Sequence, residues 1–203
     1  MKTFRSNGKL LVTAEYVVLD GAKALAIPTK HGQILTAEES NSNTVVWKSY
    51  DEYGKVWYNG HFIFDNGEIL KQVQDDNAIT NRLANILSAT RTLNPEFLAN
   101  SKGHRVSTYL DFNREWGLGT SSTLINNIAQ WANVDAYMLL EKTFGGSGYD
   151  IACAQHNTPI TFQLNTKNQP LVNSVGFNPI FKDHLYFVYL NQKQNSRDGI
   201  KAY

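Results

Sequence analysis

The 203-residue chain contains very little cysteine and no long apolar run. Its one cysteine, Cys153, cannot form an internal disulfide, so the sequence gives no support to a secreted, disulfide-bonded protein. The first residues lack the apolar segment of a signal peptide, and no stretch approaches the roughly 20 apolar residues that cross a membrane. We therefore expect a soluble, cytoplasmic protein without a membrane partner.

The chain also lacks an excess of either charge and a cluster of metal-ligating residues. The chain has 19 Lys and Arg against 18 Asp and Glu, with no basic run or stripe, so a nucleic-acid partner is not expected. The five histidines are scattered and lack the spacing of a metal site. Hydrophobic residues make up 42% of the chain, which is enough for the core of one large domain or two small ones.

The first third of the chain predicts mainly β-strands. Turn signals occur at Asp20-Gly21 and over 51–54. The β-prone runs lie at 10–12, 16–19, 24–28, 33–38, 44–50 and 56–58.

Helical spacing then alternates with further strands, which predicts an α+β fold. Asp75, Asp76 or Asn77 is expected to cap the first helix, and Asp135 the third. The expected helices cover 76–93, a segment directly after residue 119, 136–143 and a short segment from 150. The expected strands cover 106–112, 160–164 and 185–190.

A glycine-rich turn joins the 106–112 strand to the second helix. It reads Gly117-Leu118-Gly119-Thr120-Ser121-Ser122. A helix N-terminus offers unpaired N–H groups and a partial positive charge, glycines allow a phosphate close to the backbone, and hydroxyls can bond phosphate or Mg²⁺. The same residues also fit an ordinary tight turn before a capped helix, so the turn alone leaves both interpretations open. Neither a Walker A motif nor a Rossmann fingerprint is present.

Three segments, in order, resemble the GHMP kinases. The turn resembles their central Gly-Leu-Gly-Ser-Ser-Ala-Ala motif, and Asn7–Gly21 resembles their opening Pro-Gly-Lys segment. Gly146–Ala152, which contains Gly-Tyr-Asp-Ile-Ala, resembles the Ser-Gly-x-Asp segment of mevalonate and phosphomevalonate kinases. The resemblance implies a two-layer α+β N-terminal domain with the ribosomal protein S5 domain 2-like fold. Residues 1–165 would be this ATP-binding catalytic domain. Residues 166–203 would begin a truncated C-terminal domain that is largely absent from the chain.

The resemblance also implies catalytic roles for two matched residues. Asp150 would accept the proton of the substrate hydroxyl, although it can also be read as a helix cap. Lys9 would hold Asp150 ionised and offset charge on the γ-phosphate, although outside the motif it would be an ordinary surface lysine.

The remaining matched residues would bind ATP, Mg²⁺ and the substrate. The turn residues 117–122 would hold the ATP phosphates. Ser121 and Glu141 would ligate Mg²⁺, with Glu141 as a solvated helix residue the competing interpretation. The substrate-binding residues would be Glu15, Tyr16 and Ser147.

The implied activity is an ATP-dependent kinase that transfers the γ-phosphoryl group to a hydroxyl or phosphate of a mevalonate-pathway intermediate, phosphomevalonate or mevalonate. Tyr16, where the family commonly has His, favours the phosphomevalonate branch. Asn7 and Ala14 depart from the usual Pro and Gly. The alternatives are a diphosphomevalonate decarboxylase-like enzyme, a sugar or homoserine kinase of the same superfamily, or a non-catalytic nucleotide-binding module. A homodimer would be in keeping with the family.

Overall fold

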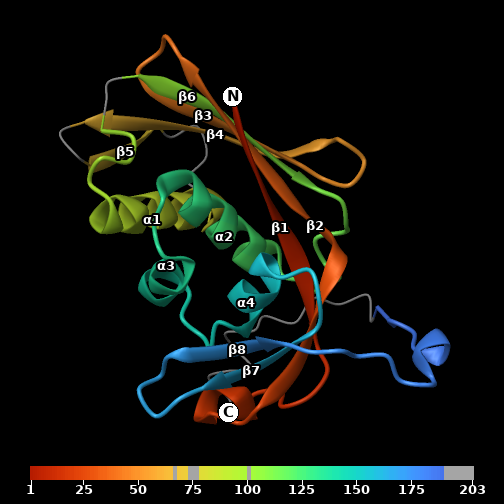
Figure 1. Ribbon diagram of the computed structural model, residues 1–203. Helices are drawn as coiled ribbons and strands as arrows, with labels where there is room; N and C mark the ends of the chain where they lie inside the picture. Colours follow the sequence, from red (N-terminus) through yellow and green to blue (C-terminus); the bar gives the residue numbers. More distant parts are fainter. Residues whose placement is uncertain (66–67, 73–77, 100–101, 190–203) are drawn as a thin grey trace.

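The computed structural model describes residues 1–65, 68–72, 78–99 and 102–189. These residues form an eight-stranded sheet and helices that lie against one of its faces (Figure 1). The strands are β1 (Lys2–Leu11), β2 (Ala24–Ser40), β3 (Thr44–Tyr50), β4 (Val56–Asp65), β5 (Glu68–Gln72), β6 (Gly103–Leu110), β7 (Ile160–Leu164) and β8 (Pro170–Ser174). The helices are α1 (Ala78–Leu93), α2 (Thr120–Ala132), α3 (Ala136–Thr143) and α4 (Tyr149–Gln155), with 3-10 turns η1 (Val17–Asp20) and η2 (Lys182–His184).

The long strand β2 organises the sheet, whose order is β5-β4-β3-β6-β2-β7-β8. One edge of β2 pairs with β1, while the other pairs with β7 through 24–26 and with β6 through 33–40. The β3–β6 pair is parallel, and the remaining pairs are antiparallel. The sheet bends around α1–α4 (Figure 1), so the chain has the expected α+β, two-layer architecture.

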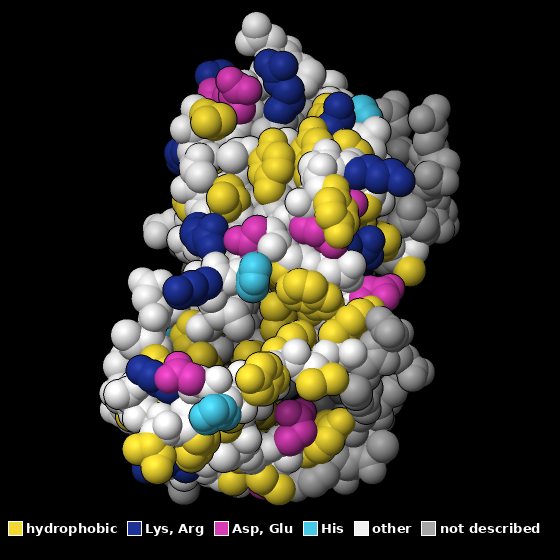
Figure 2. Space-filling model, turned by 90° about the vertical axis from the view of Figure 1, so that its right-hand side faces the viewer, with side chains coloured by type: hydrophobic (Ala, Val, Ile, Leu, Met, Phe, Trp, Pro, Cys, Tyr) yellow, Lys and Arg dark blue, Asp and Glu magenta, His cyan; other side chains and the backbone are white. Residues whose placement is uncertain are grey.

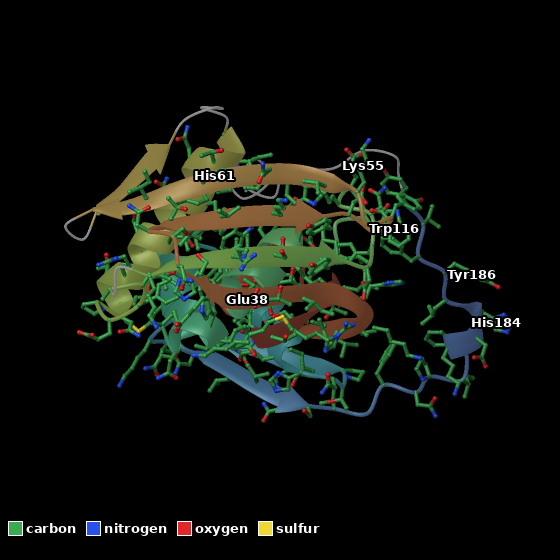
Figure 3. All side chains as sticks on the ribbon, turned by 90° about the horizontal axis from the view of Figure 1, so that it is seen from above. Glu38, Lys55, His61, Trp116, His184 and Tyr186 are labelled. Atoms are coloured by element: carbon green, nitrogen blue, oxygen red, sulfur yellow. The ribbon has the colours of Figure 1, made fainter. Side chains whose placement is uncertain are left out.

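Alternation along the strands determines which side chains enter the main core. In β6, Val106 and Leu110 are buried while Arg105 and Tyr109 are exposed, as the period of two requires. Figure 3 looks onto the outer face of the sheet, where Glu38 and His61 are labelled. The inner face packs against the helices through fully buried side chains that include Leu35, Trp47, Phe62, Ile86, Ile125 and Leu139.

A second, smaller core anchors α4 to the β2–β7 end of the sheet. Cys153 of α4 packs there with Val18, Ala26 and Phe162, all of them buried. Burial of this apolar face holds α4 in place, so the polar first turn of α4 has a fixed position beside β1.

Several elements differ from the sequence prediction. The 16–19 run is not a strand, and its residues 17–19 belong to η1, because Ala14 and Tyr16 have positive φ angles of 66° and 61° that turn the chain. The predicted strands at 24–28 and 33–38 are parts of one continuous β2. No strand is found over 185–189, and β8 was not predicted.

Two predictions are not tested by these residues. The expected caps of the first helix, Asp75, Asp76 and Asn77, lie outside the described residues. The domain boundary at residue 165 also stays a prediction, and β8, which lies beyond it, pairs with β7 in the same sheet. Within the described part of the chain, no helix is long and apolar enough to cross a membrane.

The surface beside β1 and β2 is chemically mixed. Figure 2 shows acidic, basic and apolar side chains interspersed on this side of the molecule. Some of the most exposed apolar side chains of the protein follow β8, among them Ile180, Tyr186 and Val188.

Candidate active site

Strand β1 and the helices α2 and α4 meet at one place (Figure 1). The predicted catalytic residues Lys9 and Asp150 belong to β1 and α4. The β1–β2 register shifts between Asn7 and Lys9. Beyond the shift, the backbone N–H of Lys9 donates to the carbonyl oxygen of Leu118 at 3.0 Å. A Cβ on Gly8 would lie 2.7 Å from that same oxygen, so β1 approaches the turn too closely for any other residue at position 8.

The turn before α2 has the backbone conformation that its glycines were expected to supply. Gly117 and Gly119 have φ angles of 74° and 92°, and Gly119 is the N-cap of α2. Within α2, the first backbone N–H that donates to a carbonyl of this turn is that of Thr123, which bonds to Gly119 at 3.0 Å. The N–H groups of residues 120–122 precede it and have no partner within the helix, which makes this end of α2 suited to an anion.

The hydroxyls of the turn differ in their surroundings. Ser122 is buried, and its Oγ donates to the Gly119 carbonyl at 2.9 Å, while Ser121 is exposed. Ser122 therefore stabilises the turn itself. The Ser121 hydroxyl, in contrast, faces solvent, where it is accessible to a bound group.

Asp150 lies in the first turn of α4 and follows the N-cap Gly148 by two positions. Its carboxylate accepts a hydrogen bond from the N–H of Ile151 at 3.0 Å and lies within hydrogen-bonding reach of the Ser122 hydroxyl. Burial raises the pKa of Asp150, against the opposing effect of the nearby Lys9 charge. Gly148, rather than Asp150, is the N-cap, which weakens the interpretation of Asp150 as a helix cap alone.

Lys9 is enclosed by α4 and by the segment after β1. Its Nζ donates to the Tyr149 hydroxyl at 2.9 Å. Burial acts to lower the pKa of Lys9, but Tyr149 and the Asp150 and Glu15 carboxylates together raise it above the ordinary value. Lys9 is thus an ammonium ion held next to a carboxylate at the N-terminus of α2, and not an ordinary surface lysine.

The expected substrate-binding residues lie around the same end of the sheet. Glu15 is exposed and acts electrostatically on both Lys9 and Tyr149. Ser147 Oγ accepts a long hydrogen bond of 3.5 Å from the Tyr149 N–H, and Tyr16 directly precedes η1. Substrate contact by these three residues stays a prediction.

The predicted metal pair is not brought together by any contact among the described residues. Ser121 is exposed at the start of α2, and Glu141 is exposed on α3. In the described part of the chain, no three His, Cys, Asp or Glu residues are grouped so as to hold a metal ion. The assignment of Ser121 and Glu141 to Mg²⁺ therefore stays a prediction.

Sequence reasoning missed a buried polar network beneath the site. Asn126 Nδ2 donates to Ser6 Oγ, which in turn donates to Asn127 Oδ1, both at 2.8 Å. Gln155 of α4 donates to Asn126 Oδ1 at 3.0 Å, and Asn127 donates to the Gln33 carbonyl at 3.0 Å. The network joins β1, β2, α2 and α4. Two adjacent amides between the apolar Ile125 and Ile128 were the available signal.

Comparisons with known proteins show the fold. The chain matches a Methanococcus jannaschii mevalonate kinase with TM-score 0.59 and 11% identity, covering 87% of this chain and 56% of that one. Streptococcus pneumoniae phosphomevalonate kinase, solved with phosphomevalonate and AMPPNP, matches with TM-score 0.52 and 20% identity over 80% and 50%. Lactococcus lactis galactokinase, solved with galactose, matches with TM-score 0.56 and 14% identity over 87% and 47%.

These matches cover only part of the compared proteins. The chain spans about half the length of the solved structures that it resembles. No protein-family model and no curated protein matches its sequence. The chain shares the α+β fold of these solved kinases, which is the fold that the sequence resemblance implied.

Proposed function

We propose that this chain carries the ATP-binding and catalytic part of a small-molecule kinase. The observation that supports this most strongly is the convergence of Lys9 and Asp150 beside the N-terminus of α2. Phosphoryl transfer needs an anion site, a positive charge near the transferred group and a base near the acceptor. The three elements β1, α2 and α4 each supply one of these.

In the proposed reaction, an acceptor hydroxyl oxygen bonds to the γ-phosphorus while the bond to the β–γ bridging oxygen breaks, and ADP leaves. The acceptor proton passes to Asp150, whose raised pKa makes its carboxylate a better proton acceptor. Lys9 keeps that carboxylate ionised before the reaction and offsets charge on the phosphoryl group. A phosphate acceptor would need no proton transfer, and Lys9 would then also counter its charge.

Mg²⁺ is proposed to enter with ATP. Bound Mg²⁺ neutralises charge on the β- and γ-phosphates. The exposed Ser121 hydroxyl, in the first turn of α2, is an oxygen ligand of the kind that this ion takes. Glu141 is the proposed second ligand.

The acceptor is proposed to be a mevalonate-pathway intermediate, phosphomevalonate or mevalonate. This choice rests on Tyr16 and on the sequence Gly146–Asp150, because the fold is equally that of a galactokinase. A cytoplasmic location and a homodimer remain predictions from the sequence.

The test combines calorimetric titration of ATP and Mg²⁺ with ADP release in the presence of mevalonate, phosphomevalonate, homoserine or galactose. We expect ATP binding and turnover with one of the first two. Asp150→Ala should abolish turnover and keep ATP binding. The control is Glu39→Ala, whose exposed carboxylate pairs with Lys102 at the end of β2 that lies opposite to the part paired with Lys9.

Each alternative has its own outcome. Release of CO₂ would indicate a decarboxylase, turnover with galactose or homoserine would change the acceptor, and ATP binding without turnover would leave a nucleotide-binding module. Absence of ATP binding would reject the proposed function.

A further inference from the structure

Tyr149 is the residue of the site for which the sequence motifs give no role. It is the first residue of α4 and directly precedes Asp150. Its hydroxyl accepts the hydrogen bond from Lys9 Nζ at 2.9 Å, whereas the same nitrogen lies 5.3 Å from the ring centroid. The ammonium therefore sits off the hydroxyl end of the ring and not against its face. The contact is a directional hydrogen bond.

Three contacts fix the position of Lys9. Its backbone N–H is bonded to Leu118. Its methylene chain passes Gly119 so closely that a Cβ there would lie 3.1 Å from Lys9 Cγ. Its ammonium meets Tyr149. A lysine stem is flexible and carries three donors at its end, so the first two contacts alone would leave the ammonium free to swing.

Asp150 takes its hydrogen bonds from other groups. The Ile151 N–H donates to it, and the Ser122 hydroxyl, whose proton is donated to the Gly119 carbonyl, lies within reach. No ion pair joins Lys9 to Asp150 among the described residues, although each acts electrostatically on the other. A direct ion pair would engage a carboxylate oxygen that has to receive a proton.

We propose that Tyr149 is a positioning residue whose hydroxyl holds the Lys9 ammonium between Asp150 and the glycine-rich turn before α2. The ammonium then acts on the phosphate and on Asp150 through its charge, and the carboxylate remains available to the acceptor. This inference rests on the proposed kinase function, but the contact itself can be measured without turnover.

The groups around Lys9 determine what loss of the hydroxyl would do. The titratable ones are Tyr149, Asp150 and Cys153 on α4 and Glu15 after β1. Burial raises the pKa of the Cys153 thiol to about 12, so it stays neutral. Burial also disfavours the charged form of Lys9, and Tyr149 is the largest of the opposing contacts. Without that hydroxyl, the pKa of Lys9 should fall.

The test compares Tyr149→Phe with Tyr137→Phe. Tyr137 is a matched control because its ring packs against Gly148 at the start of the same helix, and burial raises the pKa of its phenol to about 12. The first readout is a pH titration of the Lys9 ammonium by NMR in ¹⁵N-lysine-labelled protein. In Tyr149→Phe the Lys9 pKa should fall, while in Tyr137→Phe it should match the wild type.

The second readout is ATP turnover with the acceptor that the wild type uses. Hydrogen bonds to charged groups have a strength that corresponds to a loss of roughly 10- to 100-fold. We expect Tyr149→Phe to lower kcat by that factor with a small change in KM for ATP. The loss of activity at alkaline pH should also begin at a lower pH than in the wild type, because Lys9 loses its proton earlier. Tyr137→Phe should keep the wild-type profile.

The two proposals fail in different ways. If the wild type does not bind ATP, the proposed function is rejected, and the NMR titration alone decides whether Tyr149 holds Lys9. An unchanged Lys9 pKa in Tyr149→Phe overturns the inference. If that variant does not fold, an ordinary or lowered Lys9 pKa in the wild type overturns it instead.

Discussion

The backbone N–H of Lys9 donates to the Leu118 carbonyl at 3.0 Å, and this bond joins the first strand directly to the turn before α2. Its formation depends on close approach of the two segments, for which Gly8 and Gly119 leave space. Lys9 and the glycine-rich turn are therefore held together, although they are far apart in sequence.

Gly119→Ala should damage the site far more than Gly117→Ala. Both positions have positive φ, so each alanine costs roughly 1–2 kcal/mol of backbone strain. A Cβ at 119 would also lie 2.7 Å from Ser122 Oγ, whereas a Cβ at 117 would meet no atom within 4 Å beyond its own chain neighbours. Chemical denaturation should show a larger loss of stability for Gly119→Ala, and calorimetry weaker ATP binding. Equal losses of stability would contradict the packing at Gly119.

Asp150→Asn should stabilise the protein at neutral pH while abolishing turnover. Folding raises the pKa of Asp150 above the ordinary value of 3.8, so the folded state binds this proton more tightly than the unfolded state does. The contribution of Asp150 to stability is therefore fully present below pH 3.8, and it is lost as the pH rises through the raised pKa of the folded state. Asparagine carries no charge and avoids that loss.

The check is denaturant unfolding of wild type and Asp150→Asn over a series of pH values. The variant should be more stable at neutral pH, and its advantage should shrink as the pH falls toward 3.8. A variant that is less stable at neutral pH would mean that the Lys9 charge outweighs burial at this carboxylate.

Ser6→Ala should destabilise the protein by about 1–3 kcal/mol, the usual cost of leaving a buried polar group without a partner. The Ser6 hydroxyl links Asn126 to Asn127, and both amides are buried. The matched control is Ser107→Ala in β6, where the serine lies on the outer side of the sheet and is half-buried. Similar unfolding midpoints for the two variants would show that the network adds nothing to stability.

Ala14→Gly should raise stability by about 1 kcal/mol, because glycine removes left-handed strain at a φ of 66°. The opening segment of the GHMP kinases, which this part of the chain resembles, also has glycine at the position of Ala14. Ala26→Gly, at a fully buried site in β2 without positive φ, should instead lower stability. Thermal unfolding of both variants gives the comparison. A loss in Ala14→Gly would show that strain is not what limits this position.

Local pattern was sufficient for several of the regular elements. The strand at Thr44–Tyr50, the helix at Ala136–Thr143 with its Asp135 cap and the strand at Ile160–Leu164 were predicted with their observed bounds. Alternation and helical spacing follow from burial of one face, which the sequence displays directly. The resemblance of three segments to the GHMP kinases likewise implied the fold and a position of Lys9 near Asp150, and the two groups do act electrostatically on each other.

The failures come from features that depend on tertiary context. A short apolar run such as 16–19 cannot be distinguished as strand or helix from its composition. The 185–189 run is apolar and β-prone, yet strand formation needs a neighbouring strand to pair with. Hydrogen bonds such as Lys9–Tyr149 and Ser6–Asn127 join residues that no local pattern connects, so they become visible only in three dimensions.

The hydrogen bond between Lys9 and Tyr149 spans 140 positions of the sequence. Contacts of such separation form late in folding, because a long loop has to close before they contribute. During synthesis the first strand leaves the ribosome long before α4, so the chain passes through a period in which its lysine is present without either α4 partner. The contact between Lys9 and Tyr149 can therefore exist only in a chain that has been made and folded at least as far as α4.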